Sequence, residues 1–561
     1  MNKKKIAKKL IALLLVCMIT ATVAACGNGK TTNDPNTSQE ASSAPGGDSS
    51  SAPAGGNSPA PGGSSTAPGG NSPAPGGDSG SASAKDTLNY AVGLDSGTLD
   101  PMGITGSGGF LGVAATYCEP IFDNLPDGGR RWLLVTGIDP VSDLQYTYHI
   151  RPGVTFSNGN PLTADDILFT FRLYGTEPSR ALNVQSLDLE KSNVIDEYTL
   201  DLWYSEFNAA QESMLSAILI VDAESFDPQV MATNPVGTGP YEVIDYVPNS
   251  HVAMRAREDY WGGKPAIEYL NYLVFNESSQ ITNALETGAV DIATVPPSDV
   301  AYIEGLGTFN LRSLLSVMCI SAYYNMAEGA LLASKEARYA VSHAIDIESI
   351  INVAYNGYAS ATDWPASKGC VDYEARFGKL ADIYADSYNL DKARQYAEQA
   401  GLVGKTLTLI TNGADAYVTI AQIMQNDLSE IGVNLDIRNY DQASYYGLIS
   451  DVSNYDIALY FIASPNNMAV DQLASYLLFF NCGWSGPERE EYMALARSAV
   501  GIADPAARSD KLLEAVTMLV DYNPWYSFCD TQNITAFSNK LQDITTNISG
   551  RAFLEDLYFV P

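Results

Sequence analysis

The sequence predicts an α/β fold for the part of the chain that follows residue 85. Its second half places a helix, a glycine and a strand in direct succession: an apolar stripe of Ile420, Met424, Leu428 and Ile431, then Gly432, then the alternating segment "VNLDI". Its first half contains the alternating strand "LQYTYHIRPGVTF" and then the helix start "PLTADDILFTF". Helices and strands that follow one another in this way are typical of α/β construction.

The first 25 residues have the parts of a secretory signal peptide. A lysine-rich head precedes the apolar run "LIALLLVCMITATVAA", which ends in small residues and is too short for a membrane span. The exit "VAAC" is similar to the lipobox of bacterial lipoproteins, in which the cysteine is acylated and becomes the new N-terminus. We therefore expect residues 1–25 to be a lipoprotein signal peptide and Cys26 to be lipidated. A plain secretory signal with an incidental cysteine is the alternative.

The segment "GNGKTT" after Cys26 looks like the end of a phosphate-binding loop. That pattern needs a glycine at position 24, where the chain has Ala24, and it needs a strand before the loop and a helix after it. The following repeat of Ser, Ala, Pro and Gly offers no side chains that could build a core. We predict that residues 26–85 are the lipidated cysteine and a disordered tether, with an end-to-end distance of about 40 Å.

The composition excludes some classes of function. The net charge is -33, with 65 acidic against 32 basic residues, whereas nucleic-acid binding needs clustered Lys and Arg. Three histidines leave little room for histidine-based chemistry, and we expect no metal and no cofactor. The body cysteines show no C-x-x-C pair, so buried free thiols are expected, with a single disulfide as the alternative. They are Cys118, Cys319, Cys370, Cys482 and Cys529.

Local signals define further elements of the body. "DTLNYAVGL" is expected as a strand, and "LDP" at 99–101 as a turn. His149 falls on the polar face of the alternating strand and is expected at the surface, whereas His343 lies inside an apolar helix and is expected in the core.

Helix starts are marked by capping residues. Thr163 is the expected N-cap of the helix at "ADDILFTF", and Asp166, three residues later, completes a shortened capping box. In "ADPAARSDKLLEAVTMLV", Asp504 is the expected cap and Pro505 the first helical residue.

Several blocks give the body a family resemblance that covers nearly all of 86–561. The chain resembles the family 5 extracellular solute-binding proteins, the oligopeptide, dipeptide and nickel receptors of ABC importers. The order and spacing of the blocks carry the resemblance: "YTYHIRPGVTFSNGNPLTADDILFTF" (146–171), "NPVGTGPYEVIDY" (234–246), "REDYWGGKP" (257–265), "ALETGAVDIA" (284–293), "ARYAVSHAIDIESI" (337–350), "DLSEIGVNLDIR" (427–438) and "YNPWYSF" (522–528). Within them, the glycines of "GTGPY" are expected to be structural, and Tyr260 and Trp261 to pack at the surface.

The resemblance implies a two-lobed periplasmic-binding-protein fold, of type II and of the large cluster C. It has an extra subdomain inserted in lobe I and two hinge crossings. By analogy, lobe I comprises 86–130, 235–322 and 524–561, the inserted subdomain comprises 131–234, and lobe II comprises 323–523. The crossings are expected near "SAYYNM" and "DYNPW".

The resemblance also implies a function. The lobes would close on a small solute, most simply an oligopeptide, and the loaded receptor would deliver it to a membrane permease driven by separate ATPase subunits. The expected place of such a receptor is the outer face of the cytoplasmic membrane, held there as a monomer by its lipid, in a Gram-positive-type bacterium. A different solute, or a sensor or surface chaperone with the same fold, is the alternative.

One block departs from the pattern of the peptide receptors. These carry a segment, roughly W-x-x-D-x-x-x-P, whose aspartate holds the ammonium group of the peptide. In the corresponding "DIALYFIASPNNMAVDQL" (456–473) the aspartate position falls at or near Pro465, and the next acid is Asp471. A buried ammonium without a carboxylate is costly. Either Asp471 or another acid such as Glu119 takes the role, or the ligand is an oligosaccharide, a metal chelate or a modified peptide.

The predicted ligand-binding residues flank this departure or follow from the resemblance. Tyrosine suits peptides and sugars alike, because it joins a flat apolar face to a polar tip. The candidates are Tyr117, Glu119, Tyr323, Tyr324, Trp364, Tyr445, Tyr446, Tyr460, Phe461, Asn466, Asn467 and Asp471, with Trp484 and Trp525 as weaker ones.

Catalytic motifs are absent from the sequence. Both "CGWSGP" (482–487) and "TGSGG" (105–109) lack a glycine of the nucleophile pattern G-x-S-x-G, and no H-E-x-x-H occurs. We therefore expect no enzyme activity and no catalytic residue.

Overall fold

The computed structural model describes residues 85–93, 95–104, 109–177, 180–463, 468–479 and 482–560. The predicted signal peptide, Cys26 and the tether up to residue 84 lie outside the described residues, as do Asn466 and Asn467. Lys85, the last residue of the predicted tether, pairs with Asp291 of the body at 2.6 Å. Within the described residues, no helix combines the length and the apolar character that crossing a membrane requires.

The largest sheet has eleven strands and connects distant parts of the chain. In sheet order its strands are β15 (Asn434–Asn439), β14 (Thr406–Thr411), β16 (Ile457–Ile462), β12 (Phe309–Tyr324), β17 (Trp525–Ser538), β11 (Ile292–Thr294), β1 (Thr87–Val92), β10 (Tyr269–Val274), β9 (His251–Ala256) and β8 (Tyr241–Val247), with β13 (Ala359–Ala361) also paired to β17. The parallel strands β14, β15 and β16 alternate with helices, as the sequence predicted.

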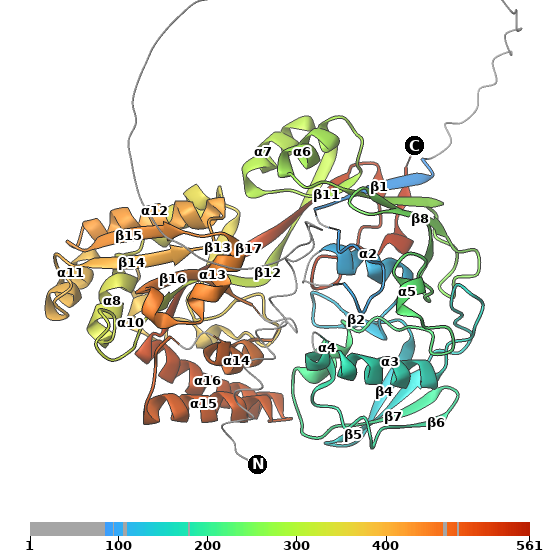
Figure 1. The fold of residues 1–561 in the computed structure, drawn as a ribbon, viewed down its shortest axis with the longest axis horizontal. Helices are drawn as coiled ribbons and strands as arrows, with labels where there is room; N and C mark the ends of the chain where they lie inside the picture. The colour runs from blue at the N-terminus through green and yellow to red at the C-terminus, as the bar shows by residue number, and fades with distance from the viewer. Residues whose placement is uncertain are drawn as a thin grey trace, which may run out of the picture. The chain divides into compact units, whose positions relative to one another are not determined.

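Two long antiparallel strands, β12 and β17, run side by side between the β14–β16 group and the β11–β1 group (Figure 1). Their pairing is regular from Phe309 to Leu315, is interrupted, and resumes at Cys319, with a second register shift between Ile320 and Ser321. At the interruption, Ser316, Val317 and Met318 of β12 lie opposite the single residue Thr531 of β17. The sheet therefore carries a bulge in the middle of its longest strand pair.

Smaller sheets belong to the first half of the chain and to its end. One has four strands, in the order β4 (Val135–Ser142), β5 (Gln145–Ile150), β7 (Thr199–Trp203) and β6 (Asn193–Asp196). Two-stranded sheets pair β2 (Phe122–Asn124) with β3 (Arg130–Trp132) and β18 (Leu541–Gln542) with β19 (Tyr558–Phe559).

Buried apolar side chains form four clusters, which we name after a strand of each. The β14 core extends from Cys319 through the second half of the chain to Cys529 and includes Met214 and Ala210. The β10 core lies beneath β1, β9 and β10, the β5 core fills the four-stranded sheet, and the β11 core surrounds β11. The bulge on β12 lies where the β14 and β11 cores meet, because Leu311 packs against the β11 core, Met318 packs against the β14 core, and residues 312–317 belong to neither. The boundaries of the lobes and of the inserted subdomain stay predictions.

The longer helices cover these cores, several of them with the caps that the sequence predicts. They are α2 (Gly109–Tyr117), α3 (Ala164–Thr176), α6 (Ser278–Glu286), α7 (Val300–Leu306), α8 (Lys335–Ala344), α11 (Leu390–Gln399), α12 (Asp415–Ser429), α13 (Gln442–Ile449), α14 (Ala469–Phe479), α15 (Pro487–Val500) and α16 (Pro505–Tyr522). The shorter turns of helix are α4 (Gln211–Leu215), α5 (Pro228–Met231), α9 (Ile347–Ser349) and α10 (Asp382–Ala385).

The predicted caps are confirmed by hydrogen bonds. The Asp166 carboxylate accepts from both the N–H and the hydroxyl of Thr163, each at 2.8 Å. Asp504 accepts from the N–H of Ala507 at 2.8 Å. Gly432, in the left-handed region at φ 75°, separates α12 from β15.

The predictions for cysteine and histidine are also confirmed. The five body cysteines are buried and free, so the alternative of a disulfide among them is wrong. His343 is fully buried in α8, where burial lowers its pKa below the usual value. His149 lies on β5 with its side chain partly exposed and contacts Asp139 at 2.8 Å.

Candidate functional site

Four of the predicted aromatic residues form one cluster between α13 and β16. The Tyr445 hydroxyl donates to the Leu459 carbonyl at 2.5 Å, and the Tyr446 and Tyr460 hydroxyls lie 2.6 Å apart. The Phe461 ring stacks on the Tyr460 ring with their centroids 4.2 Å apart. Tyr445 and Tyr460 are buried, so within this cluster Tyr446 and Phe461 offer the partly exposed ring surface.

The other three predicted tyrosines are buried and use their hydroxyls inside the protein. Tyr117 donates to the Leu99 carbonyl at 2.5 Å, and Tyr323 donates to the Phe461 carbonyl at 3.2 Å. The Tyr324 hydroxyl lies 2.9 Å from Oγ of a buried serine of α8, Ser342. These bonds satisfy the polar tip that a buried tyrosine must pair.

The predicted tryptophans are buried as well. Trp364 stacks on Phe377 with centroids 5.5 Å apart, and Trp484 stacks on Tyr522 at 4.9 Å. Trp525 donates its Nε1 hydrogen to the Pro365 carbonyl at 2.8 Å. Among the described residues, the Trp364 Nε1 group finds no acceptor. Because these rings are buried, they pack inside the protein, and their role as ligand contacts stays a prediction.

Acidic residues gather where α14 begins, close to the bulge of β12. The Asp372 carboxylate accepts from the N–H groups of Ala469 and Val470, at 2.6 and 3.0 Å, and so caps the helix. Asp471 is half-buried in the first turn of α14, where the helix dipole favours a negative charge. Asp530 of β17 is fully buried, and this burial raises its pKa to about 6.

Glu119, the second predicted acid, is buried in a different place. It follows α2 and is 3% exposed. One carboxylate oxygen accepts from the Tyr260 hydroxyl at 2.7 Å, and the other accepts from the Trp261 Nε1 group at 3.0 Å. Burial raises the pKa of Glu119 to about 7, and the nearby Glu555 adds to this rise. Tyr260 is buried, so the prediction that it packs at the surface is wrong.

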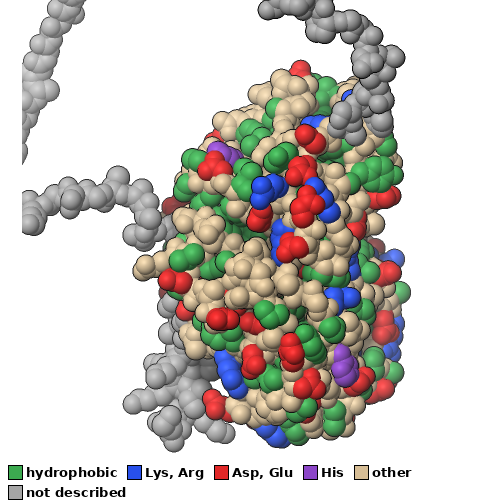
Figure 2. Space-filling view, turned by 90° about the vertical axis from the view of Figure 1, so that its right-hand side faces the viewer, with side chains coloured by type: hydrophobic (Ala, Val, Ile, Leu, Met, Phe, Trp, Pro, Cys, Tyr) green, Lys and Arg blue, Asp and Glu red, His purple; other side chains and the backbone are tan. Residues whose placement is uncertain are grey.

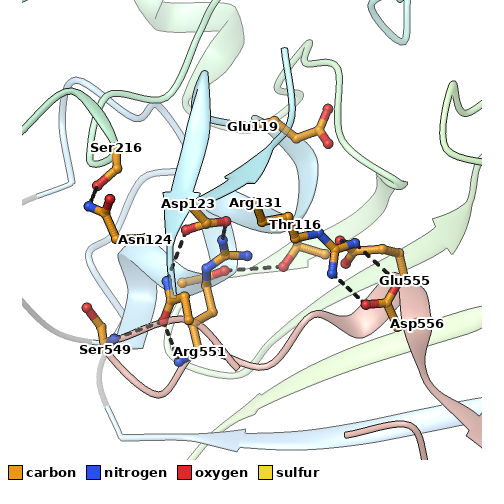
Figure 3. A network of polar contacts seen from close by, with 12 residues as sticks. Thr116, Glu119, Asp123, Asn124, Arg131, Ser216, Ser549, Arg551, Glu555 and Asp556 are labelled. Atoms are coloured by element: carbon orange, nitrogen blue, oxygen red, sulfur yellow. Dashed lines mark hydrogen bonds and ion pairs between the residues drawn. The ribbon is translucent and has the colours of Figure 1, made fainter. Parts of the chain in front are cut away.

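The residues around Glu119 belong to a network of polar contacts (Figure 3). The Arg551 guanidinium pairs with the buried Asp123 carboxylate. Arg131 bonds to Glu555 at 2.8 Å and to Asp556 at 2.5 Å, which ties β3 to the C-terminal segment. Figure 3 shows these pairs turned toward each other, with Glu119 apart from them. Paired in this way, the network holds distant segments of the chain together.

A small cavity adjoins this network. It has a volume of about 10 Å³ and is lined by Glu119, Thr116, Asp123, Arg551 and Glu555 among others. That is room for about one water molecule. With both oxygens of Glu119 bonded and so little space beside it, Glu119 is a poor anchor for a ligand's ammonium group.

The surface charges are mixed. Figure 2 shows acidic and basic side chains scattered among apolar and other side chains on one face, with no gathering of Lys and Arg. Within the described ranges, no group of three or more His, Cys, Asp and Glu is placed to hold a metal ion.

Some residues of these sites carried no signal in the sequence. Arg551 and Asp123 are 428 positions apart, and Gln472 and Val317 are 155 apart. Neither pair belongs to a sequence motif, so these contacts could be found only from the three-dimensional structure.

Comparison with protein families identifies the class of the chain. Residues 134–486 match the model of the bacterial extracellular solute-binding proteins, family 5, middle part. The chain is similar to an ABC transporter peptide-binding protein of Brucella ovis, with 27% identity over 400 residues, 64% of this chain and 71% of that protein. It is also similar to the heme-binding protein A of Haemophilus influenzae, with 25% identity over 422 residues, 68% of this chain and 75% of that protein.

Solved structures share the fold. The ABC transporter substrate-binding protein CtaP of Listeria monocytogenes matches with a TM-score of 0.75 and 23% identity, over 85% of this chain and 100% of that one. NikA of Brucella suis, in complex with Fe(III)-EDTA, matches with a TM-score of 0.75 and 18% identity, over 84% and 100%. These matches confirm an α/β fold of the periplasmic-binding-protein type. The chain thus belongs to family 5 of the bacterial extracellular solute-binding proteins, as a non-enzymatic receptor that binds a small solute for an ABC importer.

Proposed function

We propose that the protein captures oligopeptides by closing two lobes around them and delivers them to an ABC permease. Two-lobe closure is supported by the strand pair β12 and β17. These strands run from the β14 core to the β11 core, with a bulge in between. Two continuous strands can bend at one place while the cores on either side stay packed. The proposed lobes and inserted subdomain are those predicted from the sequence, except that the crossing is placed at the bulge, at residues 316–318 and Thr531, rather than near residues 322 and 524.

The proposed place of the protein is the outer face of the cytoplasmic membrane. Cys26 would be acylated after removal of residues 1–25, and residues 27–85 would serve as the tether. The support is the sequence: a signal-like head, a cysteine at its exit and a repeat of Ser, Ala, Pro and Gly. Mass spectrometry of the purified protein tests it, because an acylated Cys26 at the N-terminus has a distinct mass.

We favour peptides over heme and nickel as the solute for two reasons, the names of the relatives and the positions of the histidines. Several relatives of the chain are named as peptide-binding proteins. All three histidines of the chain lie in described segments: His343 is buried in α8, and His149 and His251 each pair with an aspartate on a surface strand. A histidine ligand to iron or nickel would have to leave one of these places.

Calorimetry decides between these solutes. The purified protein is titrated separately with a mixture of tri- to pentapeptides, with hemin, and with a nickel–histidine complex, after mass spectrometry has identified any solute that copurifies. Heat from peptides alone supports the proposal. Heat from hemin or from the nickel complex, with none from peptides, contradicts the peptide assignment and leaves the receptor class intact.

Asp471 is the proposed anchor for the peptide's ammonium group, since it is partly exposed whereas Glu119 is enclosed. Replacing Asp471 with asparagine is expected to weaken peptide binding about 10- to 100-fold, which corresponds to one hydrogen bond between charged groups. The affinity is measured by calorimetry with a free peptide and with the same peptide acetylated at its N-terminus.

The matched control is Asp165→Asn, because Asp165 is an exposed acid in the first turn of another helix, α3. It is expected to leave the affinity unchanged. An equal affinity of the parent and the Asp471→Asn variant for the free peptide would contradict the assignment of Asp471.

A further inference from the structure

The bulge on β12 is held by side chains from two elements that pack in the β14 core. We name Ser316, Val317 and Met318 the pivot segment, because they lie where the two cores meet and opposite a single residue of β17. All three are half-buried. Their backbone carbonyls cannot be satisfied by the regular ladder, because the register changes at this place.

Ser367 and Gln472 supply two of the missing hydrogen bonds. The Ser367 hydroxyl donates to the Ser316 carbonyl at 2.9 Å, and the Gln472 side-chain amide donates to the Val317 carbonyl at 3.0 Å. Both donors are fully buried. They come from separate elements, since Ser367 lies in the loop after β13 and Gln472 lies on α14.

The loop that carries Ser367 is fixed closely against the pivot segment. A Cβ atom at Gly369 would lie 2.6 Å from the Ser316 carbonyl oxygen, so the glycine allows a contact that no other residue permits. The N–H of Lys368 donates to the Asp530 carboxylate of β17 at 3.0 Å. The loop is therefore bonded to both strands of the crossing.

The two donors also share one rigid frame. Asp372, in the same loop as Ser367, caps α14, which carries Gln472. Ala366 and Cys370 of the loop and Leu473 of α14 belong to the β14 core. The bonds to the pivot segment thus run from this one core to a part of β12 that contributes no fully buried side chain to either neighbouring core.

We propose that Ser367 and Gln472 are positioning residues that set the angle at which β12 leaves the β14 core, and thereby the balance between open and closed forms. The proposal rests on the two-lobe closure proposed above. Each bond restrains one peptide group of the pivot segment. Loss of either bond therefore frees a peptide group to rotate and shifts the populations of the two forms.

The experiment measures the distance between the two sides of the crossing without any solute. p-Azidophenylalanine replaces Val141 and Val403, which are 57% and 53% exposed, and is coupled to a fluorophore pair in the full chain. Single-molecule energy transfer then gives the distribution of distances. Gln472→Met removes the donor and keeps the length of the side chain, and Ser367→Ala removes the hydroxyl.

The expected result is a change of about fivefold in the ratio of the two distance populations for each variant, as expected for one hydrogen bond. Gln425→Met is the control, because Gln425 also donates to a strand carbonyl, that of Leu435, at 2.7 Å but within the β14 core region. It is expected to leave the distribution as in the parent.

Two readouts separate positioning from folding. The midpoint of thermal unfolding is measured for every variant; should Gln472→Met not fold, Ser367→Ala decides. A variant that unfolds at the parental temperature and keeps the parental distance distribution overturns the proposal. The peptide assignment fails independently, by lack of heat from peptides in the parent protein, whose distance distribution is still measurable.

Discussion

Replacing Gly237 with alanine is expected to destabilise the protein by at least about 4 kcal/mol, or to prevent folding. A Cβ atom there would lie 2.0 Å from the Tyr117 carbonyl oxygen and 2.6 Å from the Cys118 sulfur. The first contact is with backbone, which no change of side-chain rotamer can relieve. This is the closest approach that "GTGPY" makes to the end of α2.

The backbone around Gly237 has little freedom to move away. Its carbonyl accepts from the N–H of Ser157 at 2.9 Å, and the N–H of Gly239 donates to the Tyr117 carbonyl at 2.9 Å. The buried Arg257 guanidinium bonds to the carbonyls of both glycines, at 3.3 and 3.4 Å. A shift that makes room for one methyl group would therefore break several bonds at once.

The measurement is urea denaturation followed by circular dichroism, with Gly305→Ala as the matched control. Gly305 lies on α7 with open space around its Cα, so alanine there is expected to stabilise by about 0.5–1 kcal/mol. A Gly237→Ala variant as stable as the parent would show that the end of α2 can give way.

The sequence predicted those parts of the fold that depend on neighbours along the chain. The caps at Thr163 and Asp504 need only residues within one helical turn. The end of α12 needs only Gly432, which takes a positive φ more readily than other residues. Such signals are complete within a few positions, so they could be read without the structure.

The candidate site was less predictable, because its geometry depends on long-range pairing. Alternation shows that Tyr323 and Tyr324 point to opposite faces of a strand, but both faces of β12 are covered here and both residues are buried. The pivot segment arises from a register shift between strands more than 200 positions apart. No local pattern specifies which carbonyls such a shift leaves for Ser367 and Gln472 to bind.

Between low and neutral pH, Glu119 is expected to lower the free energy of unfolding by about 3 kcal/mol, and Glu119→Gln is expected to abolish this change. The pKa of Glu119 rises from its usual 4.5 to about 7 on folding, mainly because burial disfavours the charged form. The folded state therefore holds a proton that the unfolded state has released. This contribution to stability is complete below pH 4.5, falls as the pH rises, and is lost above about pH 7.

Glutamine reproduces the protonated form of Glu119. A carboxylic acid in this place can accept from the Trp261 Nε1 group with one oxygen and donate its proton to the Tyr260 hydroxyl oxygen with the other. The amide of glutamine can do the same with its oxygen and its NH₂ group. The variant is thus expected to match the parent at low pH and to be the more stable protein above neutral pH.

Urea denaturation at a series of pH values gives the free energy of unfolding of variant and parent. In the difference between the two, the contributions of the other titrating groups cancel. Glu398→Gln serves as the control, because Glu398 is exposed on α11 and is expected to give a flat difference. A flat difference for Glu119→Gln as well would mean that Glu119 has the same pKa in the folded and the unfolded protein. The network around Asp123 and Arg551 would then have to supply the missing stabilisation, since the direct partners of Glu119 are two neutral donors.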